Sequence, residues 1–231
     1  MSRSGIAQVG PLFPNGLTHN HTCTASVVAS RSGDTILTAA HCLSGPVDRI
    51  LFVPGYTGKK APFGVWRVTA AYVTTDWLTH QTPADDFAVL TVANRDVDGR
   101  SVTLASVVGA ERVGTTPRAG TSIRIAAYNN GKGDDSLTCA TQLSKVRGHP
   151  TFFCHGFVGG SSGSPWLTGA RSSPVVVGVI GGRHQGGCTE FVSHSPVFGS
   201  AVTALVARAA RGGPADDPPA AGSDNCPADA A

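Results

Sequence analysis

The chain has 231 residues, of which only 14% are charged, and its formal net charge is +3. No cluster of Lys and Arg forms a stripe along the sequence, so we expect no nucleic-acid partner. No apolar run approaches the roughly 18 residues that a membrane-spanning helix needs, so we expect no membrane role. The 29 Gly and 15 Pro residues separate short runs rich in Val, Ile and Thr. This pattern predicts an all-β protein of short strands joined by tight turns.

Six cysteines in a chain of this length indicate an oxidising compartment. Residues 1–15 lack a basic start followed by an apolar core, so this chain contains no recognisable signal peptide. The simplest interpretation is a secreted protein in mature or trimmed form. The spacing of the cysteines does not by itself decide how they pair.

The first part of the chain, residues 1–108, has the alternating pattern of half-buried strands. We expect this region to form one β-domain, with strands over residues 6–13, 22–30, 35–39, 51–53, 64–71 and 87–92. A turn-rich linker, 109–121, follows it.

Residues 122–211 are expected to form a second β-domain that ends in a helix. Its predicted strands cover residues 122–128, 137–143, 151–154, 164–167, 174–180 and 190–194. Residues 197–210 are Ala-rich with helical spacing, which predicts a C-terminal α-helix. Residues 212–231 turn to Pro, Ala, Gly and Asp, and we expect a flexible tail, ordered at most near Cys226.

Three short sequence motifs contain candidate catalytic groups, in this order along the chain: Thr38–Cys42 (TAAHC), Asp85–Leu90 (DDFAVL) and Gly160–Pro165 (GSSGSP). They provide an imidazole, a carboxylate before an apolar strand, and a hydroxyl. A serine hydroxyl becomes a good nucleophile when an imidazole takes its proton and a buried carboxylate fixes the tautomer of that imidazole.

The ordered set resembles the chymotrypsin-like serine protease superfamily, over about residues 9–211. It is most similar to the secreted trypsin-like proteases of actinobacteria, which include the glutamyl-endopeptidase type. The resemblance implies two antiparallel six-stranded β-barrels, an active site in the cleft between them, and a C-terminal α-helix. It also implies a serine endopeptidase that acts on polypeptides, needs no metal or other cofactor, and is monomeric. A protein inhibitor or a propeptide is a further candidate partner.

The resemblance assigns the catalytic roles to His41, Asp86 and Ser162. Asp85 is the competing carboxylate, but in the family the aspartate next to the apolar strand takes the role, which favours Asp86. Among the serines, Ser164 precedes Pro165, which biases it toward extended backbone. Matching the family phrase residue by residue selects Ser162.

The backbone N–H groups of Gly160 and Ser162 are expected to form the oxyanion hole, where each donor is worth roughly 10²–10³ in rate. Ser161 stands where animal relatives have an aspartate that pairs with a new N-terminus after activation cleavage. The resemblance therefore excludes activation by that ion pair.

The resemblance also implies disulfides. A bridge beside the catalytic histidine recurs in this fold, and the implied pairs are Cys23–Cys42, then Cys139–Cys154, with Cys188 and Cys226 left to pair with each other.

The residues expected to bind substrate are those of the two walls of the specificity pocket: Gly156, Phe157, Ile180, Gly181, Gly182 and Arg183. Relatives that cleave after Lys or Arg have an aspartate at the position of Gly156, and those that cleave after Glu have a histidine in the strand that carries Ile180. Neither residue is present, so the sequence does not define which residue precedes the cleaved bond.

Two other functions fit parts of the sequence. One is a protease fold used only for binding, although all three triad positions and the oxyanion glycine are intact. The other is an α/β-hydrolase esterase, because residues 159–163 contain Gly-x-Ser-x-Gly centred on Ser161. That fold needs a helix directly after the serine and a downstream acid and histidine. Pro165 and a strand-like segment follow here, which disfavours the esterase.

Overall fold

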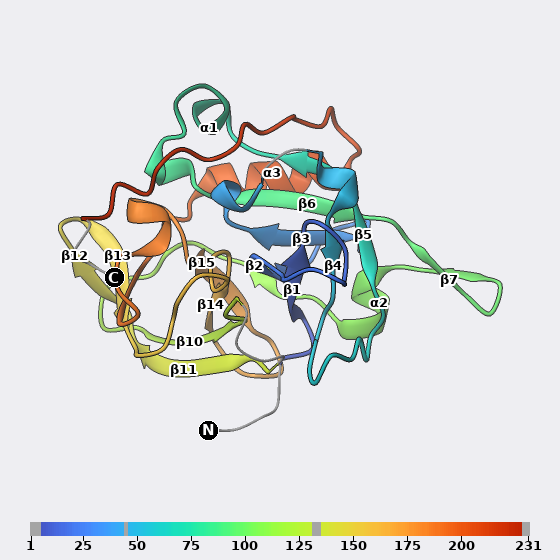
Figure 1. Cartoon of the computed structure of the whole chain (residues 1–231), viewed down its shortest axis with the longest axis horizontal. Helices are drawn as coiled ribbons and strands as arrows, with labels where there is room; N and C mark the ends of the chain where they lie inside the picture. Colours follow the sequence, from blue (N-terminus) through green and yellow to red (C-terminus); the bar gives the residue numbers. More distant parts are fainter. Residues whose placement is uncertain (1–5, 44–45, 131–134, 228–231) are drawn as a thin grey trace.

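The computed structural model describes residues 6–43, 46–130 and 135–227, so residues 1–5 of the predicted first domain and 228–231 of the predicted tail lie outside it. The first half of the chain forms a closed barrel with strand order β1-β2-β3-β6-β5-β4 (Figure 1). Its strands are β1 (Val9–Phe13), β2 (Cys23–Val27), β3 (Thr35–Thr38), β4 (Leu51–Phe52), β5 (Trp66–Tyr72) and β6 (Ala88–Val92). The predicted first six-stranded barrel is therefore confirmed.

The interior of this barrel is filled by aliphatic and aromatic side chains from every strand. Leu12, Ile36, Phe52, Trp66 and Leu90 are all at most 2% exposed and belong to one cluster. Burying side chains of this size is worth roughly 1.5–3 kcal/mol each, which makes this cluster a main source of stability for the first half.

Pairing between β3 and β6 brings two distant parts of the chain to one edge of the barrel. The strands are antiparallel, with Ile36 opposite Leu90 and Thr38 opposite Ala88. The residues that follow β3 therefore lie next to those that precede β6.

The second half contains two sheets. A five-stranded sheet has the order β11-β10-β14-β15-β9, and a three-stranded sheet has the order β12-β13-β16. The strands are β9 (Arg112–Val113), β10 (Ser122–Ala127), β11 (Leu137–Gln142), β12 (Ser144–Val146), β13 (His149–Phe153), β14 (Pro165–Thr168), β15 (Val175–Val179) and β16 (Val192–His194). Phe152, Trp166, Val177 and Ile180 pack between these sheets.

This arrangement differs from the single six-stranded barrel expected for the second half. Leu143, between β11 and β12, exchanges backbone hydrogen bonds with Gly120 and Thr121 instead of continuing either strand. Within the described residues, the strand pairings therefore form two separate sheets around a common core.

Short elements between the predicted strands were missed. They include a hairpin of β7 (Arg95–Val97) and β8 (Arg100–Val102), and the helices α1 (Thr75–His80) and α2 (Leu104–Val108). The hairpin turns at Asp98-Gly99, where both residues have positive φ, as a two-residue turn with Asp-Gly favours. The side chains of Thr74 and Thr103 cap the two helices. Among the residues described, none of the helices has the length and apolar character that crossing a bilayer requires.

Part of the predicted linker 109–121, residues 111–113, pairs with strands of the two halves. Glu111 donates its N–H to Val27 and accepts from Ala29, and β9 pairs in parallel with β15. The C-terminal helix is present as α3 (Ser200–Ala210), but it packs on the first barrel, where Val202 and Leu205 share a cluster with Val89. The division at 108 and 122 stays a prediction, and contacts between the two halves cross both boundaries.

The expected flexible tail lies along the body of the protein as far as the structure describes it (Figure 1, red). Asp216 forms an ion pair with Arg208 and accepts the N–H of Val73 at 2.8 Å, and its own N–H bonds to Ala71. The composition of this segment indicates flexibility, but composition alone does not show that Asp216 has partners elsewhere in the fold. The prediction of a free segment is corrected for residues 212–227.

Candidate active site

His41 and Asp86 meet at the edge formed by β3 and β6. His41 lies in a short 3-10 helix, η1 (Ala40–Cys42), and Asp86 directly follows another, η3 (Pro83–Asp85). His41 Nδ1 lies 2.7 Å from Asp86 Oδ2, and the His41 backbone N–H donates to Asp86 Oδ1 at 2.9 Å. The Asp86 side chain is 0% exposed and that of His41 7%. The carboxylate therefore fixes both the ring and the backbone of His41.

The second half completes the environment of Asp86. The Gly182 N–H donates to Asp86 Oδ2 at 2.7 Å. A Cβ on Gly181 would lie 3.0 Å from the same oxygen. The two glycines thus let the end of β15 approach the buried charge closely, and the hydrogen bonds offset its burial. The sequence predicted Gly181 and Gly182 as substrate-binding residues, and that role stays a prediction beside the contact of Gly182 with Asp86.

The segment that carries the candidate nucleophile turns sharply against the first barrel. Gly163 has φ +80°, and a Cβ there would lie 2.1 Å from Thr38 Oγ1 and 2.2 Å from Thr24 O. Gly160 has φ +95°, and a Cβ there would lie 2.2 Å from the backbone N of Asn130. Only glycine fits these positions without displacing backbone.

The three neighbouring serines differ in burial. Ser161 is 5% and Ser164 0% exposed, and the Ser164 hydroxyl has no hydrogen-bond partner among the described residues. Ser162 is half-buried and lines the same cleft as His41. Ser161 also lines that cleft, so exposure alone separates it from Ser162.

Some backbone N–H groups near Ser162 donate hydrogen bonds within the protein, and others do not. The N–H groups of Ser161 and Gly163 donate to Val158 and Ile180. Those of Gly160 and Ser162 donate no hydrogen bond within the described part of the chain. These two are the groups that the sequence predicted for an oxyanion hole.

Thr24, on β2, supports this turn and was missed by sequence reasoning. Its hydroxyl donates to Gly160 O at 3.0 Å and accepts from Tyr128 N at 3.0 Å, and its backbone N–H donates to Ser162 O at 2.8 Å. It is 0% exposed. An isolated threonine in a strand carries no sequence signal for such a role.

A cleft of about 1110 Å³ contains His41 and Ser162. Of the predicted substrate-binding residues, Phe157 and Ile180 line it. Gly182 and Arg183 instead line a second hollow of about 380 Å³ behind Asp86. Residues that sequence reasoning missed also line the main cleft, among them Arg49, His184, Glu190, Ser193 and Asp224.

Gly156, predicted for the pocket, contacts Glu190, whose backbone carbonyl accepts the N–H of the neighbouring Phe157. The Gly156 N–H donates to a carboxylate oxygen of Glu190, whose other oxygen lies 2.6 Å from His155 Nδ1. The hydrogen bond from His155, followed by that from Gly156, holds the pKa of Glu190 below its usual value. Glu190 is therefore ionised at neutral pH.

His149 of β13 and His194 of β16 lie with their ring centroids 6.3 Å apart, and Arg183 acts electrostatically on both. Burial, reinforced by Arg183 and His149, lowers the pKa of His194 to about 4. Burial and the same arginine also lower the pKa of His149. Both imidazoles are thus neutral at physiological pH.

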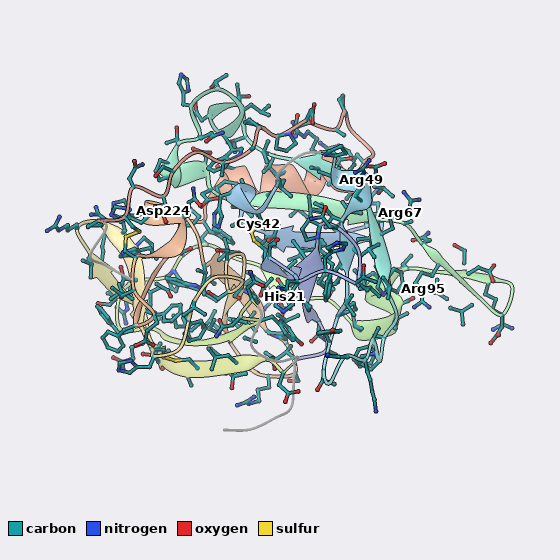
Figure 2. All side chains as sticks on the ribbon, in the orientation of Figure 1. His21, Cys42, Arg49, Arg67, Arg95 and Asp224 are labelled. Atoms are coloured by element: carbon teal, nitrogen blue, oxygen red, sulfur yellow. A yellow bond between two sulfur atoms is a disulfide. The ribbon has the colours of Figure 1, made fainter. Side chains whose placement is uncertain are left out.

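Three disulfides, Cys23–Cys42, Cys139–Cys154 and Cys188–Cys226, join the pairs that the resemblance implies, with Cα–Cα distances of 6.0, 6.6 and 5.5 Å. The first fastens η1 to β2, and Figure 2 shows Cys42 in the middle of the molecule beside the barrel. Among the described residues, two clusters have the spacing of possible metal ligands, one around His41 and one around His184. Each cluster includes two cysteines that form one of these disulfides.

The barrel, the cleft and the surrounding loops define a chymotrypsin-like fold. Residues 23–179 match the trypsin-like peptidase domain family, and the chain belongs to this family of serine proteases. A comparison with curated protein sequences found no match.

Solved bacterial protease structures are similar to this chain over nearly its whole length. The protease Anisep from Arthrobacter nicotinovorans is 25% identical, with a TM-score of 0.75 over 91% of this chain and 98% of Anisep. The thermostable serine protease AL20 from an extremophilic microorganism is 22% identical, with a TM-score of 0.75 over 89% and 98%. A Glu endopeptidase is 20% identical, with a TM-score of 0.64 over 86% and 88%. At these identities, the similarity to AL20 and to the Glu endopeptidase is one of fold alone.

Proposed function

We propose that the chain is a secreted serine endopeptidase that hydrolyses peptide bonds through an acyl-enzyme formed on Ser162. The observation that carries the proposal is the buried Asp86–His41 hydrogen bond of 2.7 Å at a cleft that Ser162 also lines. A histidine oriented by a buried carboxylate is the base that such a mechanism needs to take the proton of a serine hydroxyl.

In the proposed reaction, the Ser162 hydroxyl attacks the carbonyl carbon of the scissile bond while His41 takes its proton. Asp86 orients the ring and stabilises the imidazolium. His41 then gives the proton to the leaving amine as the C–N bond breaks. A water molecule, activated by His41 in the same way, hydrolyses the ester and releases Ser162.

The proposed oxyanion hole consists of the N–H groups of Gly160 and Ser162. Support comes from their availability, since neither donates a hydrogen bond within the described residues. Thr24 is a positioning residue for this hole, because its hydroxyl bonds to Gly160 O.

Secretion is proposed from the three disulfides, which are typical of oxidising compartments. We also propose that polypeptides are the substrates and that the protein acts as a monomer without a metal or organic cofactor.

Labelling with a sulfonyl fluoride, followed by peptide mass spectrometry, tests the nucleophile. We expect one modified site, Ser162, with labelling abolished in Ser162→Ala. Ser164→Ala is the matched control, because its buried hydroxyl lies outside the cleft lining, and it is expected to label normally. Modification at Ser161 would contradict the assignment, and no labelling at all would favour a protease fold used only for binding.

A further inference from the structure

Two hollows adjoin the candidate catalytic residues and share three lining residues. The main cleft contains Ser162 and His41, and the second hollow lies behind Asp86 and is lined by Trp77, Pro83 and Arg183. Only His184, Gln185 and Asp224 line both. We call these three residues the partition.

The partition is built from two segments far apart in sequence. One is η4 (Arg183–Gly186), in which His184 and Gln185 both have positive φ. The other is the C-terminal segment, which Figure 2 shows reaching the orange ribbon near the labelled Asp224. His184 Nδ1 bonds to Asp224 O at 2.9 Å, and Gln185 Nε2 donates to Gly222 O at 2.7 Å.

Further contacts hold the C-terminal segment across both halves of the molecule. Gln81, which ends α1, donates to Ala220 O at 2.7 Å and accepts the N–H of Gly222 at 2.8 Å. On the far side of the partition, the Cys188–Cys226 disulfide joins the segment to the wall of the main cleft. The segment is thus fastened at both ends of the partition.

The partition adjoins the wall that the sequence predicts for the residue before the scissile bond. Ile180 of that predicted wall lines the main cleft, and η4 begins three residues after it along the chain. Substrate residues further toward the N-terminus would continue past η4 toward the second hollow.

We propose that residues 220–226, with η4, form a wall that limits how many substrate residues the enzyme binds on the N-terminal side of the cleaved bond. The wall makes the enzyme select substrates by the length of the peptide before the cleaved bond. Removal of the Cys188–Cys226 disulfide that anchors the wall joins the two hollows into one longer groove. This inference rests on the proposed peptidase function.

Two fluorogenic peptides test the wall. They share one scissile sequence, taken from the cleavage sites in a digest of denatured protein, and the longer one is extended only at its N-terminus. The double variant Cys188→Ser/Cys226→Ser releases the anchor without leaving a free thiol. We expect the ratio of kcat/KM for the long peptide to that for the short one to rise by about tenfold, which is the lower end of what a single added methylene contributes in an apolar pocket.

Cys139→Ser/Cys154→Ser is the matched control, because it removes a disulfide away from the partition and is expected to leave the ratio unchanged. Gln185→Ala provides a second variant that keeps all disulfides and is expected to raise the ratio in the same direction. An unchanged ratio in both partition variants, or a fall in the ratio, would overturn the proposal. Sulfonyl fluoride labelling of each variant reports the catalytic groups separately, so failure of the wall is distinguishable from failure of the peptidase function.

Discussion

The two halves of the molecule hold their candidate catalytic groups in different ways. In the first half, His41 and Asp86 lie at the ends of two paired strands of a closed barrel, so the strand register itself brings them together. In the second half, Ser162 lies in a turn whose glycines pack against residues from other elements, including Thr24 and Thr38 of the first barrel. The base and its carboxylate depend on one barrel, whereas the nucleophile depends on how the two halves fit.

The largest expected effect comes from breaking the pair in the first half. Asp86→Asn preserves the shape of the side chain but removes the charge that fixes the His41 tautomer, and we expect kcat to fall by about 10⁴-fold. Steady-state kinetics with a peptide substrate measures this. Asp85→Asn is the control, since both hydrogen bonds that hold His41 involve the Asp86 carboxylate, and it is expected to retain most activity. Equal losses in both variants would contradict the assignment of Asp86.

Gly163→Ala is expected to disturb the contact between the turn that carries Ser162 and the first barrel. The added methyl would meet Thr38 Oγ1 and Thr24 O at about 2 Å, so we expect a loss of roughly 10²-fold in kcat and of about 1–3 kcal/mol in unfolding free energy. Gly120→Ala is matched, because its φ of +87° is similar but a Cβ there would meet nothing within 4 Å. Activity and urea denaturation compare the two. A similar loss of activity in Gly120→Ala would show that backbone strain, and not the contact between halves, is responsible.

The smallest effect on activity is expected from Glu111, which lies buried where the two halves meet and bears on stability. Its backbone pairs with Val27 and Ala29, it is 0% exposed, and burial raises the pKa of its carboxyl to about 8. The folded state therefore holds a proton that the unfolded chain releases above its ordinary pKa of 4.5. Stability from this group is complete below about pH 4.5 and declines as the pH rises through 8.

Glu111→Gln is expected to remove this decline, since an amide stays neutral at every pH. The difference is on the order of a few kcal/mol by pH 8 to 9, in favour of the variant. Urea denaturation of both proteins between pH 5 and 9 measures it, with Asp217→Asn as an exposed control. Parallel pH profiles for the wild type and Glu111→Gln would show that Glu111 ionises normally in the folded state.

Local patterns in the sequence determined the β-class, the strands of the first half, the C-terminal helix and the motifs that contain His41, Asp86 and Ser162, while the family resemblance implied that the first strands close into a barrel. Strand alternation, helical spacing and short catalytic motifs each depend only on residues that are close together in the sequence, so they can be recognised without the fold. The roles of the three catalytic candidates and of the oxyanion amides remain predictions.

Tertiary structure alone decided what each of these groups contacts. Gly182 bonds to Asp86 across a separation of 96 residues, and Thr24 bonds to Gly160 across 136. Neither contact has a signal in the neighbouring sequence, because the partners are chosen by the packing of the halves. The C-terminal segment is the same case, since its composition indicates flexibility while Gln81, Arg208 and Cys188 hold it in place. A segment poor in apolar residues can be ordered when specific partners elsewhere in the fold satisfy its polar groups.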